Sequence, residues 1–514
     1  MFKYFYLIVF ILFTSTVSAQ ITLPSIISDN MVLQADSNVP IWGKADAQSK
    51  ITVACSWNDE KITADTNEQG KWMVKLKTPK KGKKSTITIT CGKESRTITN
   101  ILIGQVWLCS GQSNMQWLVK HSNNADKELA KAKLPNIRLF NVKRSSSKEP
   151  LDDCFGEWVE CNAETAAEFS AVGYYFGKEL YKKLRKPIGL INSSYGGTPA
   201  QAWTSKETLA KDELLKIYLE NDANSEVQKE IYLQQYAKVL NKWKQNVTKA
   251  VAKGTPAPKK PIPPAQLRDE CKPARLYNAM IHPLIPFAIK GAIWYQGESN
   301  ASEAVIYRKL FPSLITNWRE DWKQGDFPFY YVQLAAYGKF DLTRPTDSKW
   351  AMLREAQSLT LSLPNTGMAV AMDIGEPNNI HPKNKQDVGK RLALWALAKD
   401  YGFKKITYSG PLYKNMKIEG DKIRIFFEYA DSGLKIPKGQ SLKGFAIAGA
   451  DKEFVWANAK IDGNTVLVWS EEVKNPTAVR YGWSDWMECN LYNKKVLPAS
   501  PFRTDDFSGE AETE

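Results

Sequence analysis

Hydrophobic and polar positions alternate with a period of two between residue 20 and about residue 100. The segments "ITVACSW", "KWMVKLK" and "STITITC" place an apolar side chain at nearly every second position, and the turn-like segments "TNEQGK" and "PKKGKK" lie between them. Such alternation over short segments predicts strands that bury one face. We therefore predict a β-sandwich-like N-terminal domain over residues 20–100.

From residue 101 the pattern changes to nearly continuous apolar runs separated by helical stretches. The runs include "VWLCS", "GLIN", "AIWY", "FYYVQL" and "MAVAMDI", and the helical segment "NKQDVGKRLALWALAKDYG" follows the last of them. Short apolar strands that alternate with helices are typical of a parallel sheet covered on both faces. The expected fold class of residues 101–404 is therefore α/β, with helices flanking a parallel sheet.

Two further segments differ from this α/β pattern. Residues 205–270 contain charged helical stretches and then the run "KGTPAPKKPIPP", whose prolines favour a stiff, extended chain, and we interpret them as an insertion. After about residue 405 the period-two alternation returns in "KIRIFFEY", "GFAIAG" and "TVLVWS". We therefore predict a β-rich C-terminal domain over residues 405–514.

The N-terminus has the pattern of an export signal. Lys3 is followed by the apolar run "YFYLIVFILF" and by small residues that end at Ala19. The run is too short to span a bilayer, and the small residues are typical of a signal-peptide cleavage site. We therefore expect residues 1–19 to be removed, no integral membrane segment to remain, and the protein to be exported to the periplasm or secreted.

Charge and cysteine content narrow the choice of partners and cofactors. The net charge is +15, but the lysines are interleaved with acidic residues, so with export we expect no nucleic-acid partner. The seven cysteines are an odd number, and Cys55 with Cys91 and Cys154 with Cys161 are candidate disulfides that the sequence leaves open. With three histidines and no C-x-x-C or H-E-x-x-H motif, we expect no metal and no cofactor.

Polar residues follow four of the predicted strands, at the point where each strand ends. In chain order they are Ser113, the pair Gly196 and Gly197, Gln296 with Glu298, and His381. Because parallel strands end at one edge of a sheet, we expect these groups to lie close together. A lone serine in a turn carries little weight, and the argument rests on four strand ends that supply complementary groups.

These residue types suit acyl transfer. A serine hydroxyl becomes a good nucleophile when a neighbouring base takes its proton, and histidine has a suitable pKa for this. Backbone N–H groups of a glycine loop and a side-chain amide can stabilise the oxyanion that follows. Thr198 and Pro199 predict a helix start that would direct the Gly196 and Gly197 amides towards the same edge.

Five segments together resemble the sialate O-acetylesterase family, a branch of the SGNH hydrolases that is also similar to some acetylxylan esterases. They are "WLCSGQSNMQW", "SSYGGTPAQAW", "IWYQGESNA", "NIHPKNKQDVGKRLALWAL" and "ECNLYNKKVLPASPFRTD". The resemblance implies an SGNH-type, flavodoxin-like sheet, with Ser113 as nucleophile and His381 as general base and then acid. It also implies that Ser113, Gly197 and Gln296 donate to the oxyanion, and Glu298 is expected to support its own loop.

One part of the family pattern is missing from this chain. Relatives commonly carry an aspartate two or three residues before the histidine, where this chain has Asn379 and Asn378. A neutral amide cannot stabilise an imidazolium as a carboxylate does. Glu376 is the favoured substitute, and Asp373, Glu298 or a backbone carbonyl that orients the ring of a Ser-His dyad are the alternatives.

The resemblance implies a carbohydrate O-acetylesterase that removes O-acetyl groups from sialic acids through a serine acetyl-enzyme. Its partner would be an O-acetylated sugar or glycan, and the basic net charge suits the carboxylate of sialic acid, for which Arg354 is one candidate. Acetylated xylan or another plant glycan is the alternative substrate. The rival class is an inactive glycan-binding protein, in which Trp483 and Trp486 would stack on sugar rings.

Overall fold

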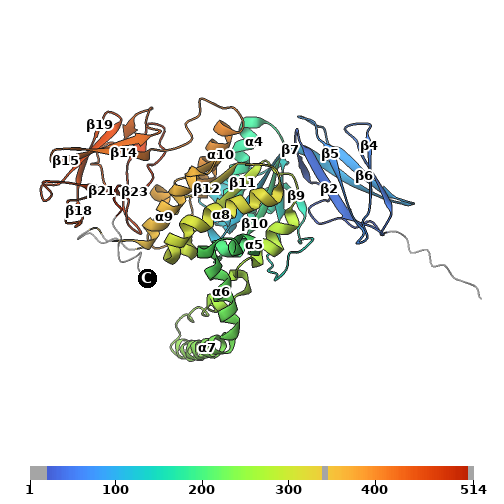
Figure 1. Ribbon diagram of the computed structural model, residues 1–514, viewed down its shortest axis with the longest axis horizontal. Helices are drawn as coiled ribbons and strands as arrows, with labels where there is room; N and C mark the ends of the chain where they lie inside the picture. The colour runs from blue at the N-terminus through green and yellow to red at the C-terminus, as the bar shows by residue number, and fades with distance from the viewer. Residues whose placement is uncertain (1–19, 339–344, 346, 507–514) are drawn as a thin grey trace, which may run out of the picture.

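The computed structural model describes residues 20–338, 345 and 347–506. A β-rich N-terminal region, a central α/β body and a β-rich C-terminal region follow one another along its long axis (Figure 1). The predicted signal peptide, residues 1–19, lies outside the described residues. Within the described ranges, no helix has both the length and the apolar content needed to cross a bilayer.

The central sheet consists of parallel strands with one antiparallel strand at its edge, in the order β13-β12-β11-β7-β10-β8-β9. Only the β8–β9 pair of this path is antiparallel. The expected α/β fold with a parallel sheet is thereby confirmed. The strands are β7 (Glu94–Gly111), β8 (Leu134–Asn141), β9 (Trp158–Cys161), β10 (Ile188–Ser194), β11 (Gly291–Tyr295), β12 (Phe329–Val332) and β13 (Thr366–Ala369).

Helices cover both faces of this sheet. Neighbouring residues of a strand point to opposite faces. The Tyr330 ring of β12 lies 6.2 Å from that of Trp395 in α10 (Lys385–Lys399), and the next ring, Tyr331, lies 5.0 Å from Phe311 in α8 (Ala304–Trp322). The other helices of the body are α1 (Ser113–Gln116), α2 (Ala125–Leu129), α3 (Ala163–Ala167), α4 (Ala171–Leu184), which packs on α10, α5 (Lys206–Ala210), and α9 (Lys349–Leu359), which packs on α8.

The N-terminal region pairs directly with the central sheet through β7. The first half of β7 pairs with β6 and its second half with β10 and β11, because the strand runs unbroken from Glu94 to Gly111. The division expected at residue 100 therefore falls inside one strand, and the domain limits stay predictions. The remaining strands are β1 (Val32–Gln34), β2 (Asn38–Lys44), β3 (Lys50–Cys55), β4 (Lys61–Asp65), β5 (Lys71–Lys77) and β6 (Ser85–Cys91).

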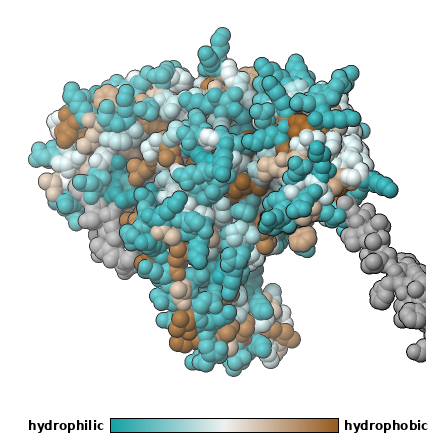
Figure 2. Space-filling model, turned by 45° about the vertical axis from the view of Figure 1, so that its right-hand side comes forward, coloured by the Kyte–Doolittle hydropathy of each residue, from teal (hydrophilic) through white to brown (hydrophobic). Residues whose placement is uncertain are grey.

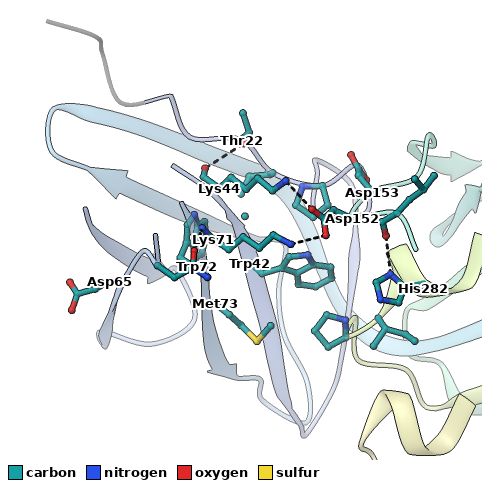
Figure 3. Close-up of a pocket in the computed structure, with 17 residues that line it drawn as sticks. Thr22, Trp42, Lys44, Asp65, Lys71, Trp72, Met73, Asp152, Asp153 and His282 are labelled. Carbon is teal, nitrogen blue, oxygen red and sulfur yellow. Dashed lines mark hydrogen bonds and ion pairs between the residues drawn. The ribbon is translucent and has the colours of Figure 1, made fainter. Parts of the chain in front are cut away.

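A cavity of about 570 Å³ separates the β2–β5 pair from the central body (Figure 3). Lys44 and Lys71 reach across it to the Asp152 carboxylate, at 2.9 and 2.8 Å. On the body side, the Nδ1 atom of His282 lies 2.9 Å from the Leu151 carbonyl oxygen. These contacts join the N-terminal region to the body at a place other than the strand ends that carry the predicted site.

The C-terminal region has a hydrophobic core of its own, which includes Ile423, Ile447 and Val466. Its strands form two four-stranded sheets and one two-stranded pair. They are β14 (Leu412–Glu419), β15 (Lys422–Glu428), β16 (Leu434–Lys435), β17 (Phe445–Ala448), β18 (Val455–Trp456), β19 (Asn458–Asp462), β20 (Thr465–Trp469), β21 (Ala478–Tyr481), β22 (Tyr492–Asn493) and β23 (Phe502–Arg503).

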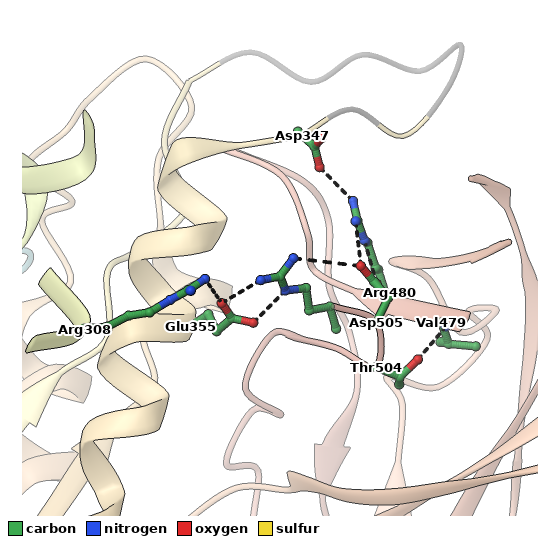
Figure 4. A network of polar contacts seen from close by, with 8 residues as sticks. Arg308, Asp347, Glu355, Val479, Arg480, Thr504 and Asp505 are labelled. Atoms are coloured by element: carbon green, nitrogen blue, oxygen red, sulfur yellow. Dashed lines mark hydrogen bonds and ion pairs between the residues drawn. The ribbon is translucent and has the colours of Figure 1, made fainter. Parts of the chain in front are cut away.

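A chain of ion pairs joins this region to α9 (Figure 4). Glu355 of α9 accepts a hydrogen bond from Arg503 at 2.7 Å, and Arg480 binds the Asp505 carboxylate with two nitrogens at 2.8 and 3.0 Å. The Asp505 side chain is fully buried, so the bidentate guanidinium compensates a charge that water cannot reach.

The insertion forms a helical projection from the body. It contains α6 (Glu213–Val227) and α7 (Lys229–Ala252), and no residue of α7 is buried. The proline-rich run returns along α7, where Tyr236 and Trp243 donate to the carbonyl oxygens of Pro261 and Pro258. Figure 2 shows hydrophobic atoms on this projection, in keeping with the exposure of Val251.

All seven cysteines are free thiols in the structure. Cys55 and Cys91 lie on the paired strands β3 and β6, but their register partners are Ile87 and Ile51. Neither candidate disulfide of the sequence is therefore formed.

Candidate active site

Three strands end together at the edge where the sequence places the polar residues. In the parallel register, Gly111 of β7 is paired both with Ser194 of β10 and with Tyr295 of β11. The loops that follow these residues therefore begin side by side. This flush register brings Ser113, the Gly196-Gly197 pair and Gln296 to one edge of the sheet.

The loops at this edge need glycine at two points, in the turn into α1 and in the loop after β10. Gly111 has φ of +135°, and a Cβ atom there would lie 2.2 Å from the Tyr295 carbonyl oxygen. A Cβ atom on Gly196 would lie 3.2 Å from the Ser113 Cβ atom and 3.0 Å from Gln116 Oε1. Backbone of the glycine loop thus approaches the serine more closely than a side chain would allow.

The N–H groups of Ser113 and Gly197 are among the backbone donors at this edge that have no acceptor within the described residues. The Gly196 N–H instead donates to Gln116 Oε1 at 2.7 Å. The Ser113 N–H is free because it belongs to the first turn of α1. Both free N–H groups belong to residues that the sequence predicts as oxyanion donors.

The predicted third donor, Gln296, is buried and holds its neighbours. Its Nε2 atom donates to Asn300 Oδ1 at 2.7 Å and lies 3.4 Å from the Thr198 carbonyl oxygen, while its Oε1 atom accepts from Tyr307 at 3.0 Å. These contacts fix the loop that carries Gly197. Donation by Gln296 to an oxyanion stays a prediction.

Thr198 does not cap a helix, contrary to expectation. Its hydroxyl donates to the Tyr195 carbonyl oxygen and accepts from the Trp203 indole N–H. The helical turn that follows, Ala200–Trp203, begins one residue later than expected, with Pro199 as its N-cap residue. The first N–H of this turn, that of Ala200, donates instead to the Asn300 Oδ1 atom at 2.8 Å.

His381 lies beside the serine loop on the segment between β13 and α10. The Asn114 Nδ2 atom, next to the serine, donates to the Ile380 carbonyl oxygen at 3.0 Å. The imidazole stacks on the indole of Trp117, with ring centroids 5.2 Å apart and planes at 19°. No hydrogen bond joins His381 ring nitrogens to Ser113 Oγ in the described residues, and such bonds are often long before substrate binds.

Burial, and secondly the positive charge of Lys385, lowers the pKa of His381 below its usual value. The imidazole is therefore neutral at neutral pH, which is the form that a general base requires.

Within the described residues, no hydrogen bond joins Glu376, the favoured third member, to this ring. Glu376 accepts hydrogen bonds from the Asn379 side chain at 3.0 Å and from the Lys383 backbone N–H at 2.8 Å. Asp373 is bound by two nitrogens of Arg391 at 2.7 and 2.8 Å. Both carboxylates thus stabilise the loop around His381 rather than its side chain.

The sequence reasoning missed two buried polar residues, Asn114 and Lys385. Lys385 Nζ donates to Asn114 Oδ1 at 2.5 Å, and Glu298 Oε1 accepts from Asn114 Nδ2 at 2.5 Å. One signal could have identified Lys385: it begins the buried stripe of α10 that continues with Val388 and Leu392. The helical period places Lys385 on the buried face of α10, where a lysine is unusual.

Known proteins resemble this chain in sequence and in fold. The family model for carbohydrate esterases described as sialic acid-specific acetylesterases matches residues 103–253 and 266–398. Sialate O-acetylesterase of Rattus norvegicus is 33% identical over 93% of this chain and 93% of its own. The chain belongs to the sialic acid-specific acetylesterase family.

Further relatives agree with this membership. Sialate O-acetylesterase of Homo sapiens is 31% identical over 93% of this chain and 91% of its own. The crystal structure of a carbohydrate acetylesterase from Xanthomonas citri superposes with a TM-score of 0.80 at 36% identity, and the match covers 95% of this chain and all of that one. This member of the acetylesterase family is thus a carboxylic ester hydrolase with a flavodoxin-like body.

Two residues considered as sugar contacts are internal in this acetylesterase. Arg354 is fully buried and donates to the carbonyl oxygens of Leu334, Ala335, Ser484 and Asp485. Trp483 is also buried, with guanidinium groups packed over its ring. Arg354 therefore cannot meet a substrate carboxylate, and Trp483 cannot stack on a sugar.

The residues that the structure describes contain no group of three or more His, Cys, Asp or Glu side chains suited to hold a metal ion.

Proposed function

We propose that this esterase removes O-acetyl groups from sialic acids through an acetyl-enzyme on Ser113. The observation that carries the proposal is the pair of free N–H groups, of Ser113 and Gly197, next to a serine whose loop is tied to that of His381. Family membership supports acetyl esters of sugars as the substrate class.

In the first half of the reaction, His381 takes the hydroxyl proton while Ser113 Oγ attacks the acetyl carbonyl carbon. The carbonyl oxygen becomes an oxyanion and accepts from the Ser113 and Gly197 N–H groups. His381 then gives its proton to the sugar oxygen, the ester bond breaks, and the deacetylated hydroxyl leaves. The acetyl group remains on Ser113.

In the second half, a water molecule takes the place of the sugar. His381 accepts a proton from this water, the hydroxide attacks the acetyl carbon, and the same two N–H groups hold the second oxyanion. The proton then returns to Ser113 Oγ as acetic acid leaves. The cycle consumes one water and restores the enzyme.

The proposed base acts without a carboxylate partner. Trp117 holds the imidazole by stacking, and Asn379 Oδ1 accepts from the His381 backbone N–H at 3.0 Å. Stacking and the loop hydrogen bonds orient the ring, although they supply no negative charge to stabilise the imidazolium. We therefore assign a Ser113–His381 dyad and give Glu376 a role in the loop alone.

Basic groups beside the glycine loop favour an anionic sugar. Arg268 Nη1 donates to the Gly197 carbonyl oxygen at 3.3 Å, and the Arg144 guanidinium lies 5.4 Å from the centre of the Tyr195 ring. Arginine recognises carboxylates through its planar N–H donors. The sialic acid carboxylate would bind Arg144 or Arg268 with its acetyl group over Ser113.

Paired assays test the substrate. Wild type should hydrolyse O-acetylated sialic acid with a higher kcat/KM than acetylated xylan, and Arg268→Ala should raise KM for the sialate several-fold without changing KM for neutral p-nitrophenyl acetate. Activity on xylan alone would refute the sialate assignment. Hydrolysis of any of these esters by Ser113→Ala would refute the nucleophile.

We also propose that the chain is exported, on the pattern of residues 1–19. N-terminal sequencing of the protein recovered outside the cytoplasm should begin at Gln20. A protein that retains Met1 in the cytoplasm contradicts this part of the proposal.

A further inference from the structure

A cluster of three buried polar side chains, here called the Asn114 cluster, lies behind the proposed dyad and takes no part in its chemistry. It consists of Glu298 after β11, Asn114 in α1 and Lys385 in the first turn of α10. Asn114 lies between the other two, with its Nδ2 atom towards Glu298 and its Oδ1 atom towards Lys385, both at 2.5 Å.

Asn114 is the member of the cluster that joins the Ser113 loop to the His381 loop. It follows Ser113 in the chain, and its Nδ2 atom donates to the carbonyl oxygen of Ile380, the residue before His381, at 3.0 Å. The two loops come from opposite ends of the body sequence. This hydrogen bond therefore links the loop that carries the serine to the loop that carries the histidine.

Glu298 and Lys385 fix the direction of the Asn114 amide. A lysine nitrogen donates to Oδ1 in either protonation state, whereas Glu298 Oε1 accepts from Nδ2. If the Asn114 amide were rotated by half a turn, its NH₂ group would face the Lys385 amine and its oxygen would face the Glu298 carboxylate oxygen. The Nδ2 group is thus held towards Ile380.

Burial of these polar groups costs folding free energy that apolar side chains at the same positions would not. Lys385 is fully buried, and within the described residues it forms no ion pair. Its burial lowers its pKa to about 7, although Glu298 and Glu376 act in the opposite direction. Glu298 Oε2 is buried without a hydrogen-bond partner, and burial raises the pKa of this carboxyl. Buried polar groups that lack full pairing are unfavourable.

We propose that Glu298, Asn114 and Lys385 are positioning residues, which hold the Ser113 loop and the His381 loop in register for proton transfer. This inference rests on the proposed dyad. It assigns a role to a cluster that touches neither the substrate nor the reacting atoms. Lys385 has a second effect, since its charge opposes protonation of the nearby imidazole.

The sharpest variant is Asn114→Asp, which keeps the side-chain shape but replaces the Nδ2 donor by an acceptor. It removes the hydrogen bond to Ile380 and sets oxygen against Glu298. Lys385→Met removes the amine and keeps a long side chain. Lys383→Met is the matched control, because Lys383 is exposed and lies two residues away in the same segment.

The expected result is a fall in kcat of about ten- to a hundredfold for Asn114→Asp and Lys385→Met, with KM for p-nitrophenyl acetate changed less than about threefold, because a small displacement of reacting groups has this effect on rate. Lys383→Met should match wild type. The melting temperature of Lys385→Met should stay within a few degrees of wild type, since methionine replaces a buried amine.

A pH profile separates positioning from general structural support. Lys385 is the charged group that acts on the imidazole, and Glu298 and Glu376 act on Lys385, while the His121 ring lies 5.8 Å from the Trp117 ring, centroid to centroid. Loss of the Lys385 charge should move the acid limb of kcat/KM to higher pH. Loss of folding alone would lower the rate at every pH without moving the limb.

The outcomes are distinguishable from failure of the proposed function. If Ser113→Ala retains activity, the dyad itself is wrong. If Ser113→Ala is inactive while Asn114→Asp and Lys385→Met turn over within twofold of wild type, only the Asn114 cluster is wrong. A joint loss of rate and of melting temperature in both variants, with an unmoved acid limb, also overturns the positioning role.

Discussion

Asn379→Asp tests the assignment of a dyad, because it places a carboxylate near the position where relatives carry an aspartate. In this structure the Asn379 amide is already used. Its Nδ2 atom donates to Glu376 Oε2 at 3.0 Å and to the His381 carbonyl oxygen at 2.9 Å. Aspartate has no donor for either oxygen, so both contacts become repulsive.

The distances give the size of the effect. Two unit charges 3.0 Å apart repel by about 1.4 kcal/mol in bulk water and about 5.5 kcal/mol at an effective dielectric constant of 20. Asn379 and Glu376 are half-buried, so a cost of about 2 kcal/mol is reasonable. If the whole cost falls on the loop that carries His381, kcat/KM falls by as much as about thirtyfold.

The loss of kcat/KM in Asn379→Asp should grow as pH rises. Two adjacent carboxyls hold a shared proton to higher pH than separate ones do, and the shared proton restores a hydrogen bond. Stability of the folded loop is therefore retained at low pH and lost as pH rises. The ratio of variant to wild-type kcat/KM should be smaller at pH about 8 than at pH about 5.

The assay is kcat/KM on p-nitrophenyl acetate at both pH values, with hydrogen exchange of residues 375–383 to detect opening of the loop. Lys383→Met is the control, since the Lys383 side chain is exposed in the same loop and only its backbone takes part in hydrogen bonds within the described residues. It should change neither measurement. A rise of kcat/KM in Asn379→Asp would refute the reasoning, because it would mean that a carboxylate there orients the imidazole.

Three further predictions follow from single sites. The acid limb of kcat/KM should lie below the ordinary histidine pKa of about 6.5, because burial and Lys385 lower the pKa of His381. The same shift makes the contribution of His381 to folding stability fall as pH drops below about 6.5. An acid limb above about 6.5 would contradict this prediction. Gly196→Ala should lower kcat/KM at least about tenfold with little change in melting temperature, since the new methyl group would lie 3.2 Å from the Ser113 Cβ atom, and unchanged kinetics would show that the loop yields. Arg354→Met should destabilise the protein by about 3–5 kcal/mol in chemical denaturation, because four buried carbonyl oxygens lose their donor, while KM of the folded fraction for acetylated sialic acid stays the same.

Local patterns predicted several of the strands. In β5 the predicted alternation of "KWMVKLK" appears as buried Trp72, Val74 and Leu76 with exposed residues between them. The continuous apolar run of β10 is buried throughout, as a central parallel strand requires. The limit predicted at residue 100 falls inside β7, which changes partners without interruption, and the local pattern does not reveal which strands pair.

The site was predictable only as far as strand ends determine it. Ser113, Gly197 and His381 follow strands and come to one edge. The surroundings of His381 depend on contacts between segments far apart in the chain. Glu376 was a reasonable substitute by sequence distance, but its two carboxylate oxygens accept from the Asn379 side chain and from the Lys383 backbone N–H.

Accumulation of acetyl-enzyme tests the central claim most directly. Wild-type protein quenched during turnover of p-nitrophenyl acetate, digested and examined by mass spectrometry should carry an acetyl group on the peptide that contains Ser113, and Ser113→Ala should carry none and release no nitrophenol above background. Steady turnover by wild type with no acetyl group on Ser113, or turnover by Ser113→Ala, would contradict the account.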